Sequence, residues 1–293
     1  MAVETLKYPG QSGQPSQDPD IDMGQALIAQ QRRERLFQTL KIGIVWVVLI
    51  IFLIFLLLQF NFSPAYVFKH YGFVLAGLPL TIGISIISVL FAAILALLGA
   101  VAKLSNNSIA QGVAGLYVSL VRGTPLLVQI FIIYNGLPQI GTALIAKGMP
   151  QLGHLFILSA IQSGILALSL NYGAYMTEIF RAGIQSISGG QREAAESIGM
   201  NRIQILRRVI LPQAVRVIIP DIANQFIAMQ KDSSLVSFMG IWEMTYRANR
   251  FARQDTKFME MFIIAAVFYW ILTIVSSWLE GLLEKRMRHA YER

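Results

Sequence analysis

The chain has 293 residues, of which 55% are hydrophobic and 14% are charged, whereas about 25% of the residues of an ordinary soluble domain are charged. Its mean hydropathy of +0.57 favours a protein of the lipid bilayer over a soluble globular one. The absence of cysteine excludes disulfides and thiolate metal sites, and the net charge of +8 gathers at the ends of apolar segments, which indicates contact with membrane lipid and no nucleic acid.

Residues 1–36 are the polar beginning of the chain. The stretch PGQSGQPSQDP is too rich in Pro, Gly, Ser and Gln to bury a hydrophobic core, so we expect a disordered cytoplasmic tail. The apolar run at 42–58 is long enough for a membrane-spanning helix. We expect this first, additional helix at 37–62. Basic residues precede the apolar run and predict that its N-terminal end faces the cytoplasm, namely Arg32, Arg33, Arg35 and Lys41.

Five further apolar segments follow, and with the first they predict six spans with both termini in the cytoplasm. We expect them at about 72–102, 109–134, 155–180, 220–244 and 258–282. Small residues, which let helices pack closely in lipid, are frequent in the second span: Gly83, Ser85, Ser88, Ala92, Ala93 and Ala96. The loop at 245–257 is expected on the outer side. It breaks the positive-inside rule, because it carries Arg247, Arg250, Arg253 and Lys257.

The loop between the fourth and fifth spans is polar and contains EAAESIGMNRIQILRRVILP at 193–212. We predict two short cytoplasmic helices within 188–211. Gly199 can adopt the left-handed conformation that ends the first helix. Asn201 is a good N-cap for the second, with Gln204 in the capping-box position. Pro212 is expected to stop that second helix.

The first of these helices has short side chains on one side. Ala194, Ala195 and Ser197 would let another protein surface approach closely, and Glu193 and Glu196 could meet basic groups on it. A solvated loop that only connects two spans is the alternative interpretation.

The same residues resemble the coupling motif of membrane subunits in ATP-binding-cassette (ABC) importers: Glu193-Ala194-Ala195, then Gly199, then Ile210-Leu211-Pro212. Three other motifs resemble the polar amino-acid permease branch of that family, the histidine/glutamine permease type. These are RGTPLLVQ at 122–129, AYMTEIFRAGIQSI at 174–187 and KDSSL at 231–235. The motifs occur in the family's order over about residues 70–288, whereas the tail and the first span are additions to it.

The resemblance implies an all-α membrane protein of the inner or plasma membrane. Its fold would be the type I ABC importer transmembrane domain, a five-helix core plus one extra N-terminal helix. In that family the loop helices dock on a separate ABC ATPase subunit, which binds the ATP and Mg. A second permease subunit, identical or different, and an extracytoplasmic amino-acid-binding protein complete the transporter. The coupling residues implied are Glu193, Ala194, Ala195, Gly199, Leu211 and Pro212.

The chain itself contains no G-x-x-x-x-G-K-[ST] phosphate-binding loop, so we expect no nucleotide cofactor within it. Ionisable groups at membrane depth are energetically costly and are therefore candidates for a substrate site or gate. Arg122 lies well inside the third span and is followed by Gly123 and Pro125, which loosen a helix. If Pro220 opens the fifth span, the KDSSL motif begins near the membrane midplane. The candidates are Arg122, Glu178, Lys231, Asp232, Ser233 and Ser234.

A zwitterionic amino acid needs a basic group for its carboxylate and an acidic group for its ammonium. Arg122 or Lys231 would serve the first need, and Asp232 or Glu178 the second. The alternative is that these charges hold the bundle or a gate together; Glu178 and Arg181, three residues apart on one helix face, could form an ion pair. Asn171 and Tyr172 could line a polar cavity, although helix packing is the simpler role for them.

Two other classes of function remain as alternatives. The first is an ATP-independent secondary amino-acid transporter or channel, for which the coupling motif would be accidental. The second is a membrane enzyme, which would need clustered acids, histidines or a nucleophile. The three histidines are far apart in sequence, at 70, 154 and 289, and no G-x-S-x-G motif is present, so neither catalytic residues nor a metal site are predicted.

Overall fold

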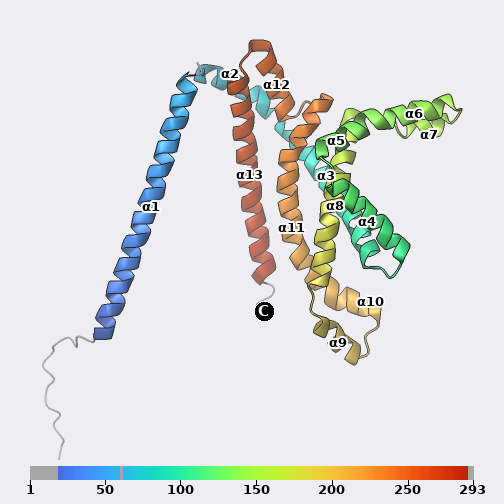
Figure 1. The fold of residues 1–293 in the computed structure, drawn as a ribbon, viewed down its shortest axis with the longest axis horizontal. Helices are drawn as coiled ribbons and strands as arrows, with labels where there is room; N and C mark the ends of the chain where they lie inside the picture. Colours follow the sequence, from blue (N-terminus) through green and yellow to red (C-terminus); the bar gives the residue numbers. More distant parts are fainter. Residues whose placement is uncertain (1–18, 60–61, 290–293) are drawn as a thin grey trace, which may run out of the picture. The chain divides into compact units, whose positions relative to one another are not determined.

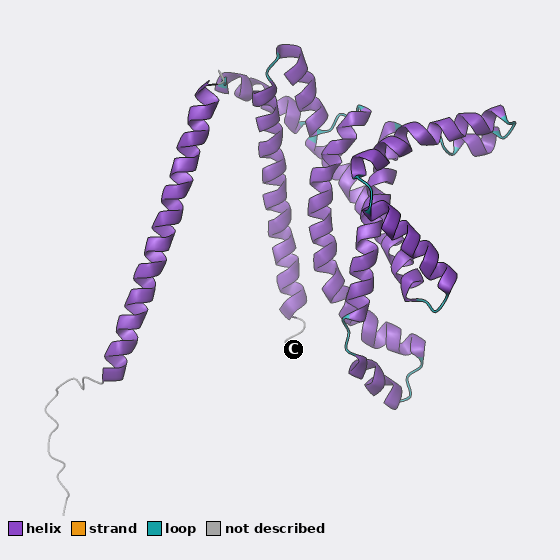
Figure 2. Ribbon diagram, viewed as in Figure 1, coloured by secondary structure: helices purple, strands orange, loops and turns teal. Residues whose placement is uncertain are grey.

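The computed structural model describes residues 19–59 and 62–289, and all regular structure in these ranges is helical, as Figure 2 shows. The expected all-α fold is therefore confirmed. The chain divides into two compact units, one ending at Phe62 and one beginning at Ser63. The first unit contains α1 (Pro19–Gln59). The second contains the remaining helices and the candidate site.

α1 is a single helix of 41 residues. It begins at Pro19, so residues 19–36, which we expected to belong to a disordered tail, are helical instead. The stretch QALIAQQRRERL explains this difference, because it consists mostly of good helix formers. The Pro- and Gly-rich composition that predicted disorder lies almost wholly at 1–18, outside the described residues.

The second unit is a bundle of long helices with shorter helices at its two ends (Figure 1). Its elements in chain order are α2 (Pro64–Leu75), α3 (Leu78–Leu104), α4 (Ser108–Arg122), α5 (Leu126–Phe131), a π-helical turn (Ile132–Gly136), α6 (Leu137–Ala146), α7 (Pro150–His154), α8 (Ala160–Gln185), α9 (Gly189–Ser197), α10 (Arg202–Ile205), a second π-helical turn (Leu206–Ile210), α11 (Leu211–Asp232), the 3₁₀ helix η3 (Ser233–Met239), α12 (Met244–Asp255) and α13 (Phe258–His289).

Four segments of the described chain are long and apolar enough to cross a membrane: 33–52, 64–104, 126–146 and 258–287. The third predicted span, 109–134, overlaps this set only at 126–134. The fourth and fifth predicted spans are absent from the set, and they correspond to α8 and α11. These helices have 26 and 22 residues, which is long enough. They are less apolar because they carry polar and charged residues, several of which meet in the candidate site.

α3 and α8 pack along their length and form the centre of the bundle. A hydrogen bond joins the two helices, in which the Ser169 hydroxyl of α8 donates to the Ser88 backbone carbonyl of α3 at 3.2 Å. The predicted small-residue face of α3 is confirmed. Four of its members are buried, namely Ser85, Ser88, Ala92 and Ala96, and the other two, Gly83 and Ala93, are half-buried.

The third predicted span, 109–134, is not one helix. α4 ends at Arg122, the backbone leaves helical geometry at Gly123–Pro125, and α5 begins at Leu126. Pro125 is the physical cause, because its ring excludes the helical conformation for the residue before it and it lacks an N–H donor. We expected a loosened helix here, and the structure has a complete break.

Two proline predictions are wrong. Pro212 does not stop a helix: it lies in the first turn of α11, where a missing N–H costs little. Pro220 does not open the fifth span: it lies inside α11, which begins at Leu211. Lys231 and Asp232 consequently lie at the end of a helix, about 30 Å along its axis from Leu211, and not half-way along it.

The segment 245–257, which we treated as an outer loop, is mostly the helix α12. Glu243 is its N-cap, and the carboxylate accepts hydrogen bonds from Tyr246 N at 2.7 Å and Thr245 N at 2.8 Å. The Tyr269 hydroxyl of α13 donates to the same carboxylate at 2.7 Å. Burial raises the pKa of Glu243, and these donors oppose that effect. The cap fixes where α12 begins.

Candidate functional site

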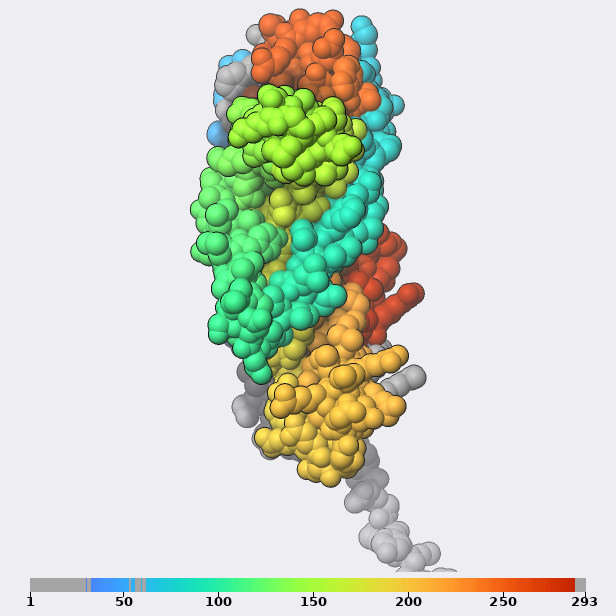
Figure 3. All heavy atoms as spheres, turned by 90° about the vertical axis from the view of Figure 1, so that its right-hand side faces the viewer, coloured from blue at the N-terminus to red at the C-terminus, as the bar shows by residue number. Residues whose placement is uncertain are grey.

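Most of the coupling and substrate-site residues predicted from the sequence lie in two regions of the second unit. The first is the helical pair α9–α10 at one end of the bundle, seen at the bottom of Figure 3. The second is a polar cavity where α8, α11 and the break after α4 meet.

The turn between α9 and α10 has the predicted geometry. Gly199 has a φ of +80°, the left-handed conformation. Its N–H donates to the Glu196 carbonyl at 2.9 Å and the next N–H donates to the Ala195 carbonyl at 3.1 Å, which closes α9. Asn201 and Gln204 exchange side-chain and backbone hydrogen bonds, both at 2.9 Å, in the predicted capping box. Both local predictions are confirmed.

We expected Ala195 on the outward face of α9, and this prediction is wrong. It is buried and packs against Ile205 and Ile210, so its small side chain lets α9 approach the segment that leads into α11. Glu193 and Ala194 are exposed, as are Leu211 and Pro212. The outward side also carries two large apolar residues that the sequence reading passed over, Ile198 and Ile203, which are 73% and 76% exposed.

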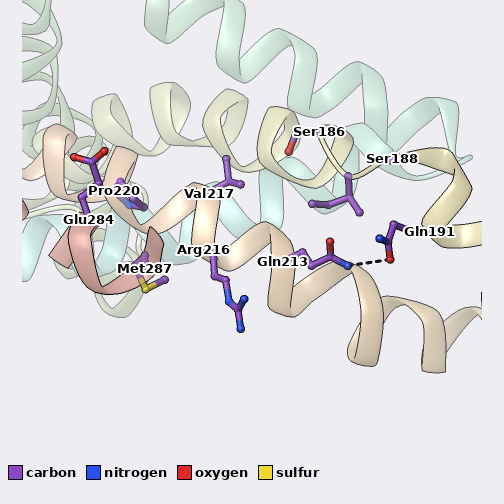
Figure 4. Close-up of a pocket in the computed structure, with 10 residues that line it drawn as sticks. Ser186, Ser188, Gln191, Gln213, Arg216, Val217, Pro220, Glu284 and Met287 are labelled. Atoms are coloured by element: carbon purple, nitrogen blue, oxygen red, sulfur yellow. Dashed lines mark hydrogen bonds between the residues drawn. The ribbon is translucent and has the colours of Figure 1, made fainter. Parts of the chain in front are cut away.

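α9 is also tied to the long helices behind it. A cavity of about 530 Å³ lies between the α8–α9 connection, α11 and α13, and Figure 4 shows the side chains that line it. On its wall the Gln213 side chain of α11 donates to Gln191 of α9 at 3.5 Å, a long and weak hydrogen bond. The pair α9–α10 is thus joined to α8 and α11 through the chain and to α11 through this contact.

The second region is a cavity of about 300 Å³ beside Asp232. The Tyr172 hydroxyl of α8 donates to the Asp232 carboxylate at the end of α11, at 2.8 Å. The residues that line it come from three elements and are mostly polar: Thr124, Pro125, Leu126, Asn171, Tyr172, Tyr175, Gln225 and Asp232. The structure therefore brings together two residues, Tyr172 and Asp232, that are 60 positions apart in sequence.

Gln129 organises the wall of this cavity at the break after α4. Its side-chain amide donates to the Val121 carbonyl at 2.7 Å and to Thr124 at 2.8 Å. It accepts from the Asn171 side chain at 3.0 Å. The broken helix leaves carbonyls without helical partners, and Gln129 satisfies them. Gln129 was not predicted as a site residue, although a polar amide inside the apolar motif at 122–129 is a detectable signal.

Arg122 is the last residue of α4, and its guanidinium lies 5.2 Å from the ring centroid of Tyr175, which lines the cavity. A cation over an aromatic face is held without a carboxylate partner, so its charge stays available to an anion. Arg122 thus lies at the break after α4, beside Tyr175, and Tyr175 and Asp232 line the same cavity.

The other ionisable candidates are arranged differently. Glu178 forms the predicted ion pair with Arg181, at 2.8 Å, and a second one with Lys103 of α3, which the sequence reading missed. Lys231 is exposed. Ser233 is buried and its hydroxyl donates to the Gln230 carbonyl at 2.7 Å. Ser234 lines a separate hollow beside α12.

Comparison with known proteins identifies the family. Residues 94–289 match the family of binding-protein-dependent transport system inner membrane components. The chain belongs to this family. It is therefore an inner-membrane component of a transport system, with several membrane-spanning helices.

Individual relatives agree with this assignment. The chain is 38% identical over 215 residues to the probable amino-acid permease protein YxeN of Bacillus subtilis (strain 168), covering 73% of this chain and 91% of YxeN. It is 40% identical over 212 residues to the L-cystine transport system permease protein TcyB of the same organism, covering 72% of this chain and 85% of TcyB.

A solved structure shows the same fold. A chain in the crystal structure of an amino acid ABC transporter with histidines superposes with a TM-score of 0.67 at 35% identity, covering 76% of this chain and 98% of that one. The type I ABC importer transmembrane fold and the resemblance drawn from the motifs are confirmed. The chain is a permease subunit, and the secondary transporter or channel is not favoured.

Proposed function

We propose that this chain carries a polar amino acid across the membrane into the cell by alternating access, driven by a separate ATPase subunit that binds the ATP and Mg. The names of its relatives, an amino-acid permease and a cystine permease, support this class of substrate. The chain's own family depends on a binding protein, which supports delivery of the amino acid from the outer side.

The observation that carries the proposal is the position of α9–α10 between two long helices. α8 runs directly into this pair, and the pair runs through the π-helical turn at 206–210 directly into α11. α8 and α11 also provide the two residues that meet in the polar cavity, Tyr172 and Asp232. A displacement imposed on α9–α10 would therefore reach the cavity along two helices.

The outer surface of α9–α10 is the proposed docking site for the ATPase. Glu193 and Ala194 lie exposed on α9, and Ile198 and Ile203 add an apolar contact at the turn. Such a surface combines an exposed apolar centre, which a partner would remove from water, with charges around it, as docking sites do. Ala195, Gly199, Leu211 and Pro212 have a shaping role in this proposal, because they set the turn and the start of α11. We also propose that both chain termini lie in the cytoplasm, because basic residues precede the first apolar run and follow the last one.

In the cavity, Asp232 is proposed to receive the substrate ammonium and Arg122 its carboxylate. Glu178 is proposed to hold α3 and α8 together, since two cations already neutralise it. Ser233 is proposed to support the end of α11 through its hydrogen bond to Gln230, and Lys231 and Ser234 stay candidates for the substrate site or gate. A second permease subunit, identical or different, is proposed to complete the pathway, with lipid around both.

Co-expression with the candidate ATPase subunits and reconstitution into liposomes tests this function. We expect ATP-dependent uptake of one or a few radiolabelled amino acids, and uptake competition across the twenty amino acids defines the substrate. The I198E/I203E variant should insert normally but lose the co-purifying ATPase, whereas I198A/I203A, which adds no charge, should lose less. Amino-acid uptake that persists without ATP would refute the proposal.

A further inference from the structure

The segment that breaks the positive-inside rule carries a continuous cationic surface. Arg247, Arg250 and Arg253 of α12, here named the arginine face, are spaced three residues apart and fall within about a third of the helix circumference. The opposite side of α12 is buried against the bundle and consists of Met244, Ala248 and Ala252. The arginine face therefore points away from the core.

Aromatic rings hold the first two of these arginines in place. The Arg247 guanidinium lies 5.1 Å from the Phe73 ring and 5.6 Å from the Trp242 ring, and that of Arg250 lies 5.4 Å from Trp242. Arg253 is held by a hydrogen bond from its Nε to Asn249 Oδ1 at 3.1 Å. Arg247 also donates from its Nε to the Trp242 carbonyl at 2.9 Å and from a terminal nitrogen to the Phe73 carbonyl at 3.4 Å. These contacts fix the guanidinium groups without neutralising their charge, and Arg250 and Arg253 are the exposed members of the face.

The nearby carboxylates are engaged elsewhere. Glu243 is buried and caps α12. Asp255 accepts from the Tyr66 hydroxyl at 2.6 Å, and Glu260 pairs with Lys257 at 3.0 Å. Within residues 19–59 and 62–289, none of the ion pairs involves the arginine face. The exposed side of α12 is thus a net positive surface with donors to spare.

The helix α12, which carries the arginine face, lies at the far end of the bundle from α9–α10, as Figure 1 shows. Arg253 lines a hollow of about 590 Å³ together with residues of η3 and α13, among them Ser234, Phe238 and Phe262. η3 begins at the residue after Asp232. A partner seated on the arginine face would therefore lie over the outer end of α11, next to the polar cavity.

We propose that the arginine face docks an acidic surface of the extracytoplasmic amino-acid-binding protein, an inference that rests on the proposed function. Arg and Trp are the residue types that dominate binding energy at protein interfaces, and opposite charges speed the encounter. The hollow shared with η3 favours a protein that delivers solute to the cavity over an anionic lipid headgroup, for which the flank of α12 alone would suffice.

The test uses the complete permease–ATPase complex in nanodiscs and the purified, amino-acid-loaded binding protein that stimulates its ATPase. R250E/R253E is expected to raise the concentration of binding protein for half-maximal stimulation about tenfold or more, while the maximal ATPase rate is retained. R250K/R253K, which keeps both charges, should show a smaller shift. The salt dependence of stimulation should weaken in R250E/R253E, because fewer charges then meet across the interface.

Three outcomes overturn the inference. In the first, the half-stimulating concentration of binding protein and its salt dependence are unchanged in R250E/R253E. In the second, R250K/R253K shifts that concentration as much as R250E/R253E does. In the third, the effect of R250E/R253E appears only in nanodiscs with anionic phospholipid. The last result would assign the face to lipid headgroups. Failure of the proposed function is distinct, because the wild-type complex itself would then show no stimulation by the binding protein.

Discussion

Gly99 of α3 is a sensitive point in the packing of α8, the helix that carries Tyr172. A Cβ atom at Gly99 would lie 2.5 Å from Thr177 Oγ1 and 2.9 Å from Thr177 Cγ2, well inside van der Waals contact. Thr177 is fully buried and its hydroxyl donates to the Gly173 carbonyl at 2.8 Å, so the side chain has little freedom to turn away. Gly99→Ala must therefore push α3 and α8 apart.

The magnitude follows from two opposing terms. Overpacking a core by one methyl group costs about 1–3 kcal/mol, and replacing Gly by Ala inside a helix returns about 1 kcal/mol. We expect a net loss of about 1 kcal/mol for Gly99→Ala. Gly83 is the matched control, because it lies on the same helix with no atom within 4 Å of an added Cβ. Gly83→Ala should be neutral or stabilising.

The measurement is thermal unfolding of the purified complex in detergent, followed by tryptophan fluorescence and by the monodisperse fraction on size exclusion. Thr177→Ala removes both atoms that clash with the new methyl group and leaves the Thr177 Cβ position 3.3 Å from it. It should therefore be better tolerated in the Gly99→Ala background than in the wild type. Equal melting temperatures for Gly99→Ala and Gly83→Ala, or a strictly additive Thr177→Ala effect, would refute this reasoning.

Three further predictions concern the two candidate regions. Asp232→Asn should raise the half-saturating amino-acid concentration in liposome uptake by roughly 30-fold or more, because it removes one partner of a buried charge pair with the substrate ammonium. The same change at exposed Asp221 should leave that concentration unaltered, and equal effects of the two changes would argue against an ammonium site. Gln129→Leu should lower the unfolding temperature, because each carbonyl left unsatisfied costs about 1–3 kcal/mol, and an unchanged melt would contradict this. Gly199→Ala should weaken ATPase retention about fivefold, since the left-handed conformation costs about 1 kcal/mol without glycine; full retention would remove the turn from the docking surface.

Local signals in the sequence predicted local structure well. Gly199 and Asn201 act within four residues of themselves, so their roles as helix end and N-cap needed no knowledge of the fold. The small residues of α3 were equally informative, because a helix with Ser88 and Ala92 on one side needs a close neighbour wherever that neighbour lies.

Prolines and long-range partners were less predictable. Pro212 and Pro220 were predicted to be helix boundaries. The π-helical turn at 206–210 instead leads directly into α11, so that Pro212 lies in the first turn of α11 and Pro220 lies inside it. The partner of Glu178, Lys103, lies 75 residues away and on another helix. The sequence predicted only the ion pair of Glu178 with Arg181. The structure adds the ion pair with Lys103, so two cations neutralise the Glu178 carboxylate.

The continuity of α11 with its neighbours suggests how work at one end could reach the other. From α9 to α12 a single stretch of chain includes the proposed ATPase docking surface, Asp232 and the arginine face in turn. Gln230, near the end of α11, is clamped to α13 by the Ser276 hydroxyl at 3.0 Å, so that end moves with α13. Tyr172–Asp232 is by contrast one hydrogen bond between α8 and α11. If the ATPase pulls on α9–α10 as proposed, α8 and α11 would shear against each other, and we propose that this bond, beside the proposed ammonium site, breaks when the cavity changes its access.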